Sequence, residues 1–165
     1  MKTLLLLRHA KSSWDDASLR DFDRPLAARG KRDAPRIGKA LAGRGPAPDL
    51  IVSSPAARAR ETIEAVIRSA RISISPRFDE AIYGASSSEL MSVIRRLPEE
   101  SFRALLVGHN PGFEDTLSRL TGAQYQMPTA ALACIEFQVE GWEDVGDGQG
   151  RLAWLVTPKT LGGDE

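Results

Sequence analysis

The chain has only two histidines, His9 and His109, and each one ends a short apolar run, at residues 3–9 and 104–109. An unbroken apolar run of this length is typical of a central strand in a parallel sheet, because helices cover both faces of such a strand. Ligands bind to these sheets just beyond the carboxyl ends of the strands. We therefore expect both imidazoles, with Arg8 beside the first, at a site of binding or catalysis rather than at two unrelated strand ends.

Several common kinds of site do not fit the residues present. A zinc site takes three or four protein ligands, so two histidines would need at least two acids from loops, and no His-Glu-x-x-His spacing occurs. The sequence has neither a Gly-x-Ser-x-Gly nucleophile turn nor a Gly-rich phosphate loop. We therefore expect no metal ion and no other cofactor.

Histidine can also act as a nucleophile. A neutral imidazole attacks phosphorus and carries the phosphoryl group, which divides one difficult transfer into two easier steps. Such a site needs cationic groups around the phosphoryl oxygens. Arg8 adjoins His9, Arg58 lies early in an expected helix whose N-terminus adds positive potential, and His109 supplies a further donor.

The hydrophobic pattern predicts the elements that position these residues. It predicts alternating strands and helices, which favours one three-layer α/β domain over residues 1–165, with a mixed, mostly parallel sheet flanked by helices. Pro35 is expected to kink the first helix or mark a restart, and Ser54 to cap the second. The expected strands are 3–9, 50–53, 72–74, 104–109, 132–139 and 151–156, and the expected helices are 25–41, 55–69, 88–97 (capped within 86–88) and 112–120.

Composition excludes several classes of protein. Lys plus Arg and Asp plus Glu both number 22, so the overall charge does not favour nucleic-acid binding. The single cysteine, Cys134, excludes an internal disulfide, and its apolar neighbours predict a buried thiol. No segment approaches the roughly 18 apolar residues of a membrane span, so we expect a cytoplasmic protein without a membrane partner.

Four motifs in order along the chain resemble those of the histidine phosphatase (phosphoglycerate-mutase-like) superfamily. The length and the segment after the first motif are similar to the compact SixA-type phosphohistidine phosphatases, which lack the inserted lid of larger members. The motifs are Arg8-His9-Ala10, Arg24-Pro25-Leu26 with Gly30, the block at 53–62 that contains Arg58, and Val107-Gly108-His109-Asn110; the segment is Lys11-Ser12-Ser13-Trp14.

The resemblance implies a role for each matching residue. His9 would accept the phosphoryl group, while Arg8, Arg58 and His109 would bind it and neutralise its charge. Ser12 is placed to hydrogen-bond phosphate. Ala10 departs from the usual glycine of the first motif, a change that matters only if that position requires a positive φ.

The general acid is less clearly marked by the resemblance. Larger members use Glu or Asp from a region that corresponds here to residues 78–84, which makes Glu80 the first candidate. Asp15 and Asp21 are the second candidates. Alternatively, Glu80 is a solvated surface acid without a catalytic role. Asp15 would also repel a bound phosphate. A phosphoramidate needs less help from an acid than an alkyl phosphate, because its imidazole leaves neutral once the ring nitrogen is protonated.

The sequence thus predicts a metal-independent phosphatase that acts through a phosphohistidine intermediate. The expected substrate is phosphohistidine on a protein, such as a histidine phosphotransfer domain, because no segment here is long enough to close a lid over the site. Two alternatives stay open: a phosphatase of a small phosphorylated metabolite, and a phosphate-binding module without turnover.

Overall fold

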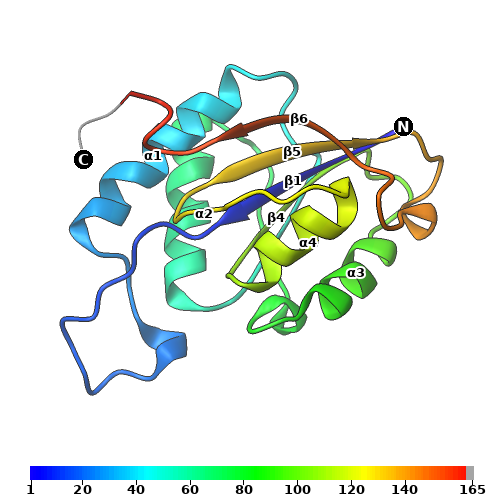
Figure 1. Ribbon diagram of the computed structural model, residues 1–165. Coiled ribbons are helices and arrows are strands. Elements are labelled where there is room, and N and C mark those ends of the chain that lie inside the picture. The colour runs from blue at the N-terminus through cyan, green and yellow to red at the C-terminus, as the bar shows by residue number, and fades with distance from the viewer. Residues whose placement is uncertain (163–165) are drawn as a thin grey trace.

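The computed structural model describes residues 1–162, which contain a six-stranded sheet between two layers of helices (Figure 1). Its strand order is β3-β2-β4-β1-β5-β6; the first four are parallel, and β5 and β6 add antiparallel pairs at one side. The predicted three-layer α/β fold is confirmed. The strands are β1 (Lys2–Arg8), β2 (Leu50–Ser53), β3 (Arg77–Phe78), β4 (Arg103–Gly108), β5 (Leu132–Phe137) and β6 (Arg151–Val156).

Two helices cover each face of the sheet. Helices α1 and α2 lie on one face, and α3 and α4 lie on the other (Figure 1). Three short 3-10 turns connect the elements: η1 (Asp21–Asp23), η2 (Glu80–Ile82) and η3 (Trp142–Asp144). The helices are α1 (Ala28–Ala42), α2 (Ala57–Ala70), α3 (Ser87–Arg95) and α4 (Gly112–Thr121).

The leucine run of β1 forms the centre of both cores. Leu4 and Leu6 pack in the cluster under α3 and α4, whereas Leu5 and Leu7 pack in the cluster under α1 and α2. Successive side chains of a strand point to opposite faces, so a strand between two helical layers must be apolar at every position. This explains why the run shows no alternation with polar residues.

The register of β1 against β4 brings the two histidines together. Arg8 pairs with Gly108 in the parallel ladder, and the amide of His9 donates to the carbonyl of Gly108 over 3.0 Å. Both strands end one residue earlier than predicted, so His9 and His109 are the first residues beyond them. Released from the ladder, both side chains lie at the carboxyl edge of the sheet.

Two expectations about local structure are wrong. Residues 72–74 form no strand; Ile72 and Ile74 pack against the α1 and α2 cluster from a loop, and the edge strand is β3. The chain leaves α2 through Arg71 in a left-handed conformation and needs the next five residues to reach the edge of β2. Ser54 does not cap α2, which begins after Ala56.

Two further expectations, the cap of α3 and the buried thiol, hold, whereas no restart occurs at Pro35. Ser86 caps α3 in a reciprocal capping box with Glu89, as the serine run indicated. Helix α1 continues through Pro35 to Ala42 without a restart. The thiol of Cys134 is buried in β5. Within residues 1–162, no helix has the length and apolar character needed to cross a membrane.

The close packing behind His109 gives a test of the fold. A Cβ at Gly108 would lie 2.3 Å from Cε1 of Phe113 and 2.9 Å from Cγ2 of Ile82, so Gly108→Ala should lower the free energy of unfolding by about 1–3 kcal/mol. Gly43→Ala is the control, because its Cβ would meet nothing nearer than 3.8 Å. Urea unfolding measures both, and equal stability of the two variants would contradict this packing.

Candidate active site

The geometry of His9 leaves one ring nitrogen free. Its Nδ1 lies 2.7 Å from the carbonyl oxygen of Ala10, and because a carbonyl only accepts, Nδ1 must carry the proton. Within the described residues, no protein group hydrogen-bonds Nε2. The side chain is buried except for 7% of its surface. The Nε2 lone pair of His9 is therefore held in a fixed orientation and is available to a ligand.

Helix α2 holds the backbone after His9. The amide of Ala10 donates to Oγ1 of Thr62 over 3.0 Å, and the Thr62 hydroxyl donates to the carbonyl of Arg58 over 2.7 Å. Ala10 is fully buried and has no positive φ. Alanine therefore fits the position where the resemblance expects glycine, without backbone strain.

His109 faces His9 across the end of the sheet. The two ring centroids are 5.1 Å apart, and Nε2 of His109 lies 2.7 Å from Oγ of Ser54. Ser54 Oγ also accepts from the amide of Ala56 over 3.2 Å, so it is fixed by the start of α2. Nδ1 of His109 is buried and has no partner among the described residues.

Both imidazoles are neutral at physiological pH. Burial lowers the pKa of His9 to about 4, and the positive charges of Arg58 and Arg8 act in the same direction. Burial likewise lowers the pKa of His109 to about 3, with His9 and Arg58 as further causes. A neutral imidazole keeps the lone pair that a nucleophile needs.

Two arginines supply the positive charge of the site. Arg58, buried at the start of α2, donates from Nη1 to the carbonyl of Asp21 over 2.6 Å and from Nη2 to its Oδ2 over 2.9 Å. Arg8 donates from Nη1 to the carbonyl of Met127 over 3.0 Å, and its buried Nε has no partner among the described residues. An unpaired buried donor is costly unless a ligand accepts from it.

Of the three acids considered from sequence, the structure places Asp21 with the site residues. Its carboxylate accepts from Arg58, from the hydroxyl of Tyr83 over 2.6 Å and from Arg24 over 2.9 Å. The hydrogen bond from Tyr83, followed by those from Arg58 and Arg24, lowers the pKa of Asp21 to about 2. Asp21 is therefore ionised and is not a general acid in this arrangement.

Glu80 and Asp15 are not part of this cluster. Both are exposed, and within the described residues neither carboxylate makes a hydrogen bond or ion pair with a histidine or arginine of the site. Glu80 begins η2, and it is Tyr83, just after that turn, that reaches the site. The turn points the tyrosine rather than the glutamate inward.

The hydroxyl of Ser12 is occupied by Arg24, which donates to it from Nη2. The Arg24 guanidinium also stacks on the exposed ring of Trp14, 3.3 Å from its centroid. Ser12 thus lies near the site, but its hydroxyl holds the loop after β1. Arg24 links that loop to Asp21.

Comparison with known proteins assigns this constellation of residues to a family. Residues 4–118 match the model of the histidine phosphatase superfamily (branch 1), a span that includes both histidines and Arg58. The chain belongs to this superfamily. The resemblance seen in the sequence is confirmed, and with it the prediction of a phosphatase.

Similar proteins span nearly the whole chain. An uncharacterised chloroplastic protein of Arabidopsis thaliana is 35% identical over 95% of this chain and 78% of its own length. Two solved structures are of proteins assigned as phosphohistidine phosphatase SixA. The Agrobacterium tumefaciens protein is 34% identical over 95% of this chain and 98% of its own, with a TM-score of 0.82. The Nakamurella multipartita protein is 28% identical over 95% and 96%, with a TM-score of 0.83. This chain is therefore of the SixA type within the histidine phosphatases.

Sequence reasoning missed a network that holds Arg8 of this histidine phosphatase. Oε2 of Glu114 accepts from the amide of Met127 over 2.7 Å and from Nδ2 of Asn110 over 3.2 Å. Nδ2 of Asn110 also donates to the Met127 carbonyl, the same oxygen that Arg8 contacts. The Glu114 carboxylate thus fixes the loop on which Arg8 rests. No motif signals this link, because Met127 lies in a loop without a recognisable pattern.

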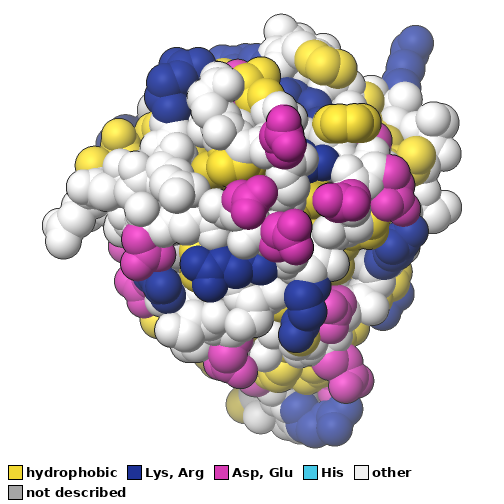
Figure 2. All heavy atoms as spheres, turned by 90° about the vertical axis from the view of Figure 1, so that its right-hand side faces the viewer, with side chains coloured by type: hydrophobic (Ala, Val, Ile, Leu, Met, Phe, Trp, Pro, Cys, Tyr) yellow, Lys and Arg dark blue, Asp and Glu magenta, His cyan; other side chains and the backbone are white. Residues whose placement is uncertain are grey.

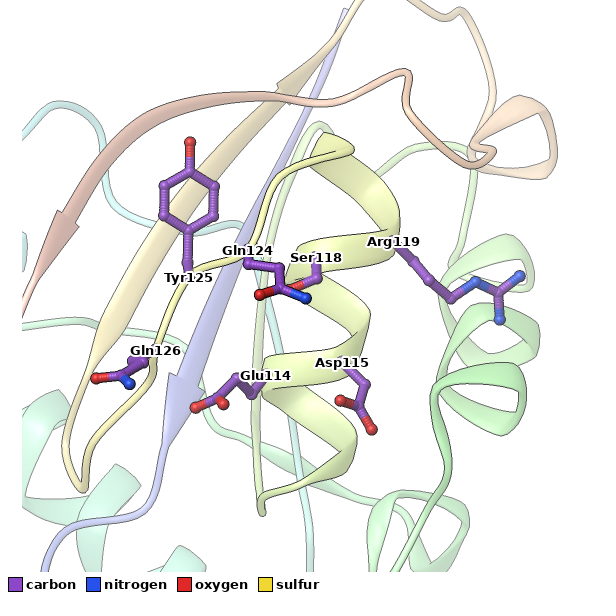
Figure 3. Close-up of a pocket in the computed structure, with 7 residues that line it drawn as sticks. All are labelled: Glu114, Asp115, Ser118, Arg119, Gln124, Tyr125 and Gln126. Atoms are coloured by element: carbon purple, nitrogen blue, oxygen red, sulfur yellow. The ribbon is translucent and has the colours of Figure 1, made fainter.

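Glu114 also lines a groove of about 710 Å³ on the outer side of α4. Figure 3 shows the groove between α4 and the loop that follows it. Neither His9 nor His109 lines it, and neither do Arg8, Arg24 and Arg58. Its lining residues are Glu114, Asp115, Ser118, Arg119, Gln124, Tyr125 and Gln126.

The face of the molecule in Figure 2 contrasts with the site. Acidic and basic side chains are interspersed on it, and no histidine is seen there. Among residues 1–162, no group of three or more His, Cys, Asp or Glu side chains is arranged to hold a metal ion.

The lowered pKa values give a titration test. In NMR spectra of the imidazole nitrogens, both histidines should stay neutral down to about pH 5 and take up protons near pH 4 and below. The unfolded chain binds these protons near pH 6.5, so stability should fall as the pH drops from about 6.5 to about 3. The single variants His9→Gln and His109→Gln assign the signals. A titration near pH 6.5 would show that the rings are not buried as described.

The Glu114 network gives a second test. Glu114→Ala leaves the amides of Met127 and Asn110 without this acceptor, so the free energy of unfolding should fall by about 1–3 kcal/mol. Asp115→Ala, an exposed acid at the next position, should change it by less than about 1 kcal/mol. Chemical denaturation of both variants is the measurement. Equal losses would show that Glu114 acts only through its charge near the helix N-terminus.

Proposed function

We propose that this phosphatase hydrolyses phosphohistidine on a protein, such as a histidine phosphotransfer domain, through a phosphoenzyme formed on His9. One observation carries the proposal. The imidazole of His9 is uncharged and is held by the hydrogen bond from Nδ1 to the carbonyl of Ala10, and no protein group hydrogen-bonds its Nε2 within the described residues. Arg8, Arg58 and His109 surround it as groups for the phosphoryl oxygens. The geometry is that of a preorganised nucleophile.

In the first step, Nε2 of His9 attacks the phosphorus atom. A new N–P bond forms, the P–N bond of the substrate breaks, and its electron pair returns to the substrate imidazole. With its other ring nitrogen protonated, that imidazole leaves as a neutral molecule. The His9 ring gains positive charge, and the carbonyl of Ala10 stabilises it through the Nδ1 proton.

In the second step, water attacks the phosphorus atom of the phosphoenzyme. The P–N bond to His9 breaks, its electron pair returns to Nε2, and the proton of the water leaves with phosphate or solvent. We infer that Arg8 and His109, whose Nε and Nδ1 atoms are buried without protein partners, donate to the phosphoryl oxygens in both steps. His109 donates from Nδ1 when the hydroxyl of Ser54 donates to its Nε2. The enzyme returns to its starting state.

The acids around the site support phosphohistidine as the substrate class. Asp21 is ionised, because the hydrogen bond from Tyr83, followed by those from Arg58 and Arg24, lowers its pKa, and Glu80 is exposed and does not contact the histidines or arginines of the site. An alkyl phosphate needs a proton donor for its leaving alkoxide, whereas a phosphohistidine does not once its ring is protonated. The similarity to proteins assigned as SixA phosphohistidine phosphatases supports the same substrate.

The test uses a protein carrying ³²P-labelled phosphohistidine, with small phosphomonoesters in parallel. His9→Ala should lower kcat/KM by at least about 10³-fold and abolish the labelled intermediate, because the nucleophile is gone. Arg58→Ala should lower kcat/KM by about 10²-fold or more, while Arg60→Ala should have little effect, since Arg60 stacks on Phe78 instead.

Three results would contradict the proposal. Activity that survives in His9→Ala would exclude His9 as the nucleophile. Activity lost on addition of a chelator would indicate a metal-dependent mechanism. Faster turnover of a small phosphomonoester than of the phosphoprotein would assign the enzyme to metabolites.

A further inference from the structure

Asp21 accepts hydrogen bonds from donors that an anionic substrate needs. Four hydrogen bonds from three side chains converge on this one residue: Arg58 contacts both its carbonyl and its carboxylate, and Tyr83 and Arg24 contact the carboxylate. Both terminal nitrogens of Arg58 are therefore directed at Asp21. A carboxylate presents two anionic oxygens, much as one face of a phosphoryl group does.

The residue that accepts from these donors lies on an exposed loop. Asp21 is in the loop between β1 and α1, and 53% of its side chain is exposed although Arg58 is almost fully buried. The base of the loop is closed by hydrogen bonds from Ser13 to Pro25 and from Ala27 to Lys11, 2.8 Å each. The base of the loop is therefore fixed independently of the contacts that Asp21 makes.

A bound phosphoryl group and the Asp21 carboxylate cannot share Arg58 without repulsion. Both are anions, and two like charges at hydrogen-bond distance disfavour one another strongly in a partly buried site. Occupation by Asp21 in turn lowers the cost of leaving the guanidinium of Arg58 buried without a ligand.

We propose that Asp21 is an internal substitute for the substrate's phosphoryl group, which displaces it from Arg58 and Tyr83 on binding. This rests on the proposed function, because it takes Arg58 as a phosphoryl ligand. The exchange makes Asp21 a determinant of specificity. An anion enters only when it binds the arginine more strongly than this carboxylate does, which favours the dianionic phosphoryl group over monoanions.

The chain provides a matched control for this residue. Asp23 lies in the same turn, η1, and its carboxylate pairs with the exposed Arg20 at 2.9 Å instead of with Arg58. Asp21→Asn and Asp23→Asn therefore remove one negative charge each from the same loop. The two variants differ in whether the carboxylate that is removed pairs with Arg58.

Calorimetric binding of inorganic phosphate is the experiment. Asp21→Asn should bind phosphate about tenfold more tightly than the unchanged protein, whereas Asp23→Asn should bind it within about twofold. Tyr83→Phe, which removes one donor to the carboxylate and keeps the charge, should tighten binding by a smaller factor. It also serves as a second variant if Asp21→Asn does not fold, which denaturation of each variant establishes.

The outcomes separate this inference from the proposed function. Unchanged or weaker phosphate binding in Asp21→Asn, with normal turnover of the phosphoprotein, would overturn the inference alone and make Asp21 a support for Arg58. Absence of phosphate binding in every variant, together with absence of turnover, would overturn the proposed function as well. An equal gain in phosphate affinity in Asp21→Asn and Asp23→Asn would show that only the overall charge of the loop matters, and it would also reject the inference.

Discussion

Parallel pairing of β1 with β4 is the constraint on which the site depends. The ladder is held by leucines that contribute to both cores, so a shift of one residue would move every side chain of β1 to the opposite layer. With that register, His9 and His109 leave the sheet side by side, and their rings lie 5.1 Å apart. Core packing thereby sets the distance between the two candidate catalytic groups.

Burial at this edge affects the imidazoles and the arginines in different ways. It lowers the pKa of both histidines, which keeps both rings uncharged, while the buried guanidinium groups of Arg8 and Arg58 need hydrogen-bond partners. The protein meets that need only in part: Arg58 has Asp21, whereas Nε of Arg8 has no partner among residues 1–162. Incomplete satisfaction of buried donors is typical of a site that awaits an anion.

Much of this arrangement could be predicted from the amino-acid order. The apolar runs predicted the central strands and the positions of both histidines at their ends, and the family motifs predicted where Arg58 would lie. The predictions of local structure failed where contacts between distant parts of the chain override the local sequence pattern. Ile72 and Ile74 alternate like an edge strand yet pack from a loop, and Ser54, a good helix cap by type, contacts His109 instead. Glu80 stays a prediction from its place in the sequence; its side chain is exposed on η2, and Tyr83 is the residue of this segment that reaches the site.

The sequence by itself determined the α/β architecture and the grouping of His9, Arg8 and His109, because hydrophobic periodicity defines strands and parallel strands end at a common edge. Only the tertiary structure decided which acid and which hydroxyls join them. Asp21 meets Arg58 across 37 positions, Tyr83 meets Asp21 across 62, and Ser54 meets His109 across 55. Such contacts depend on how loops close over the sheet. Loops have no regularly repeating buried face, so their polar residues show no periodic pattern from which these contacts could be predicted.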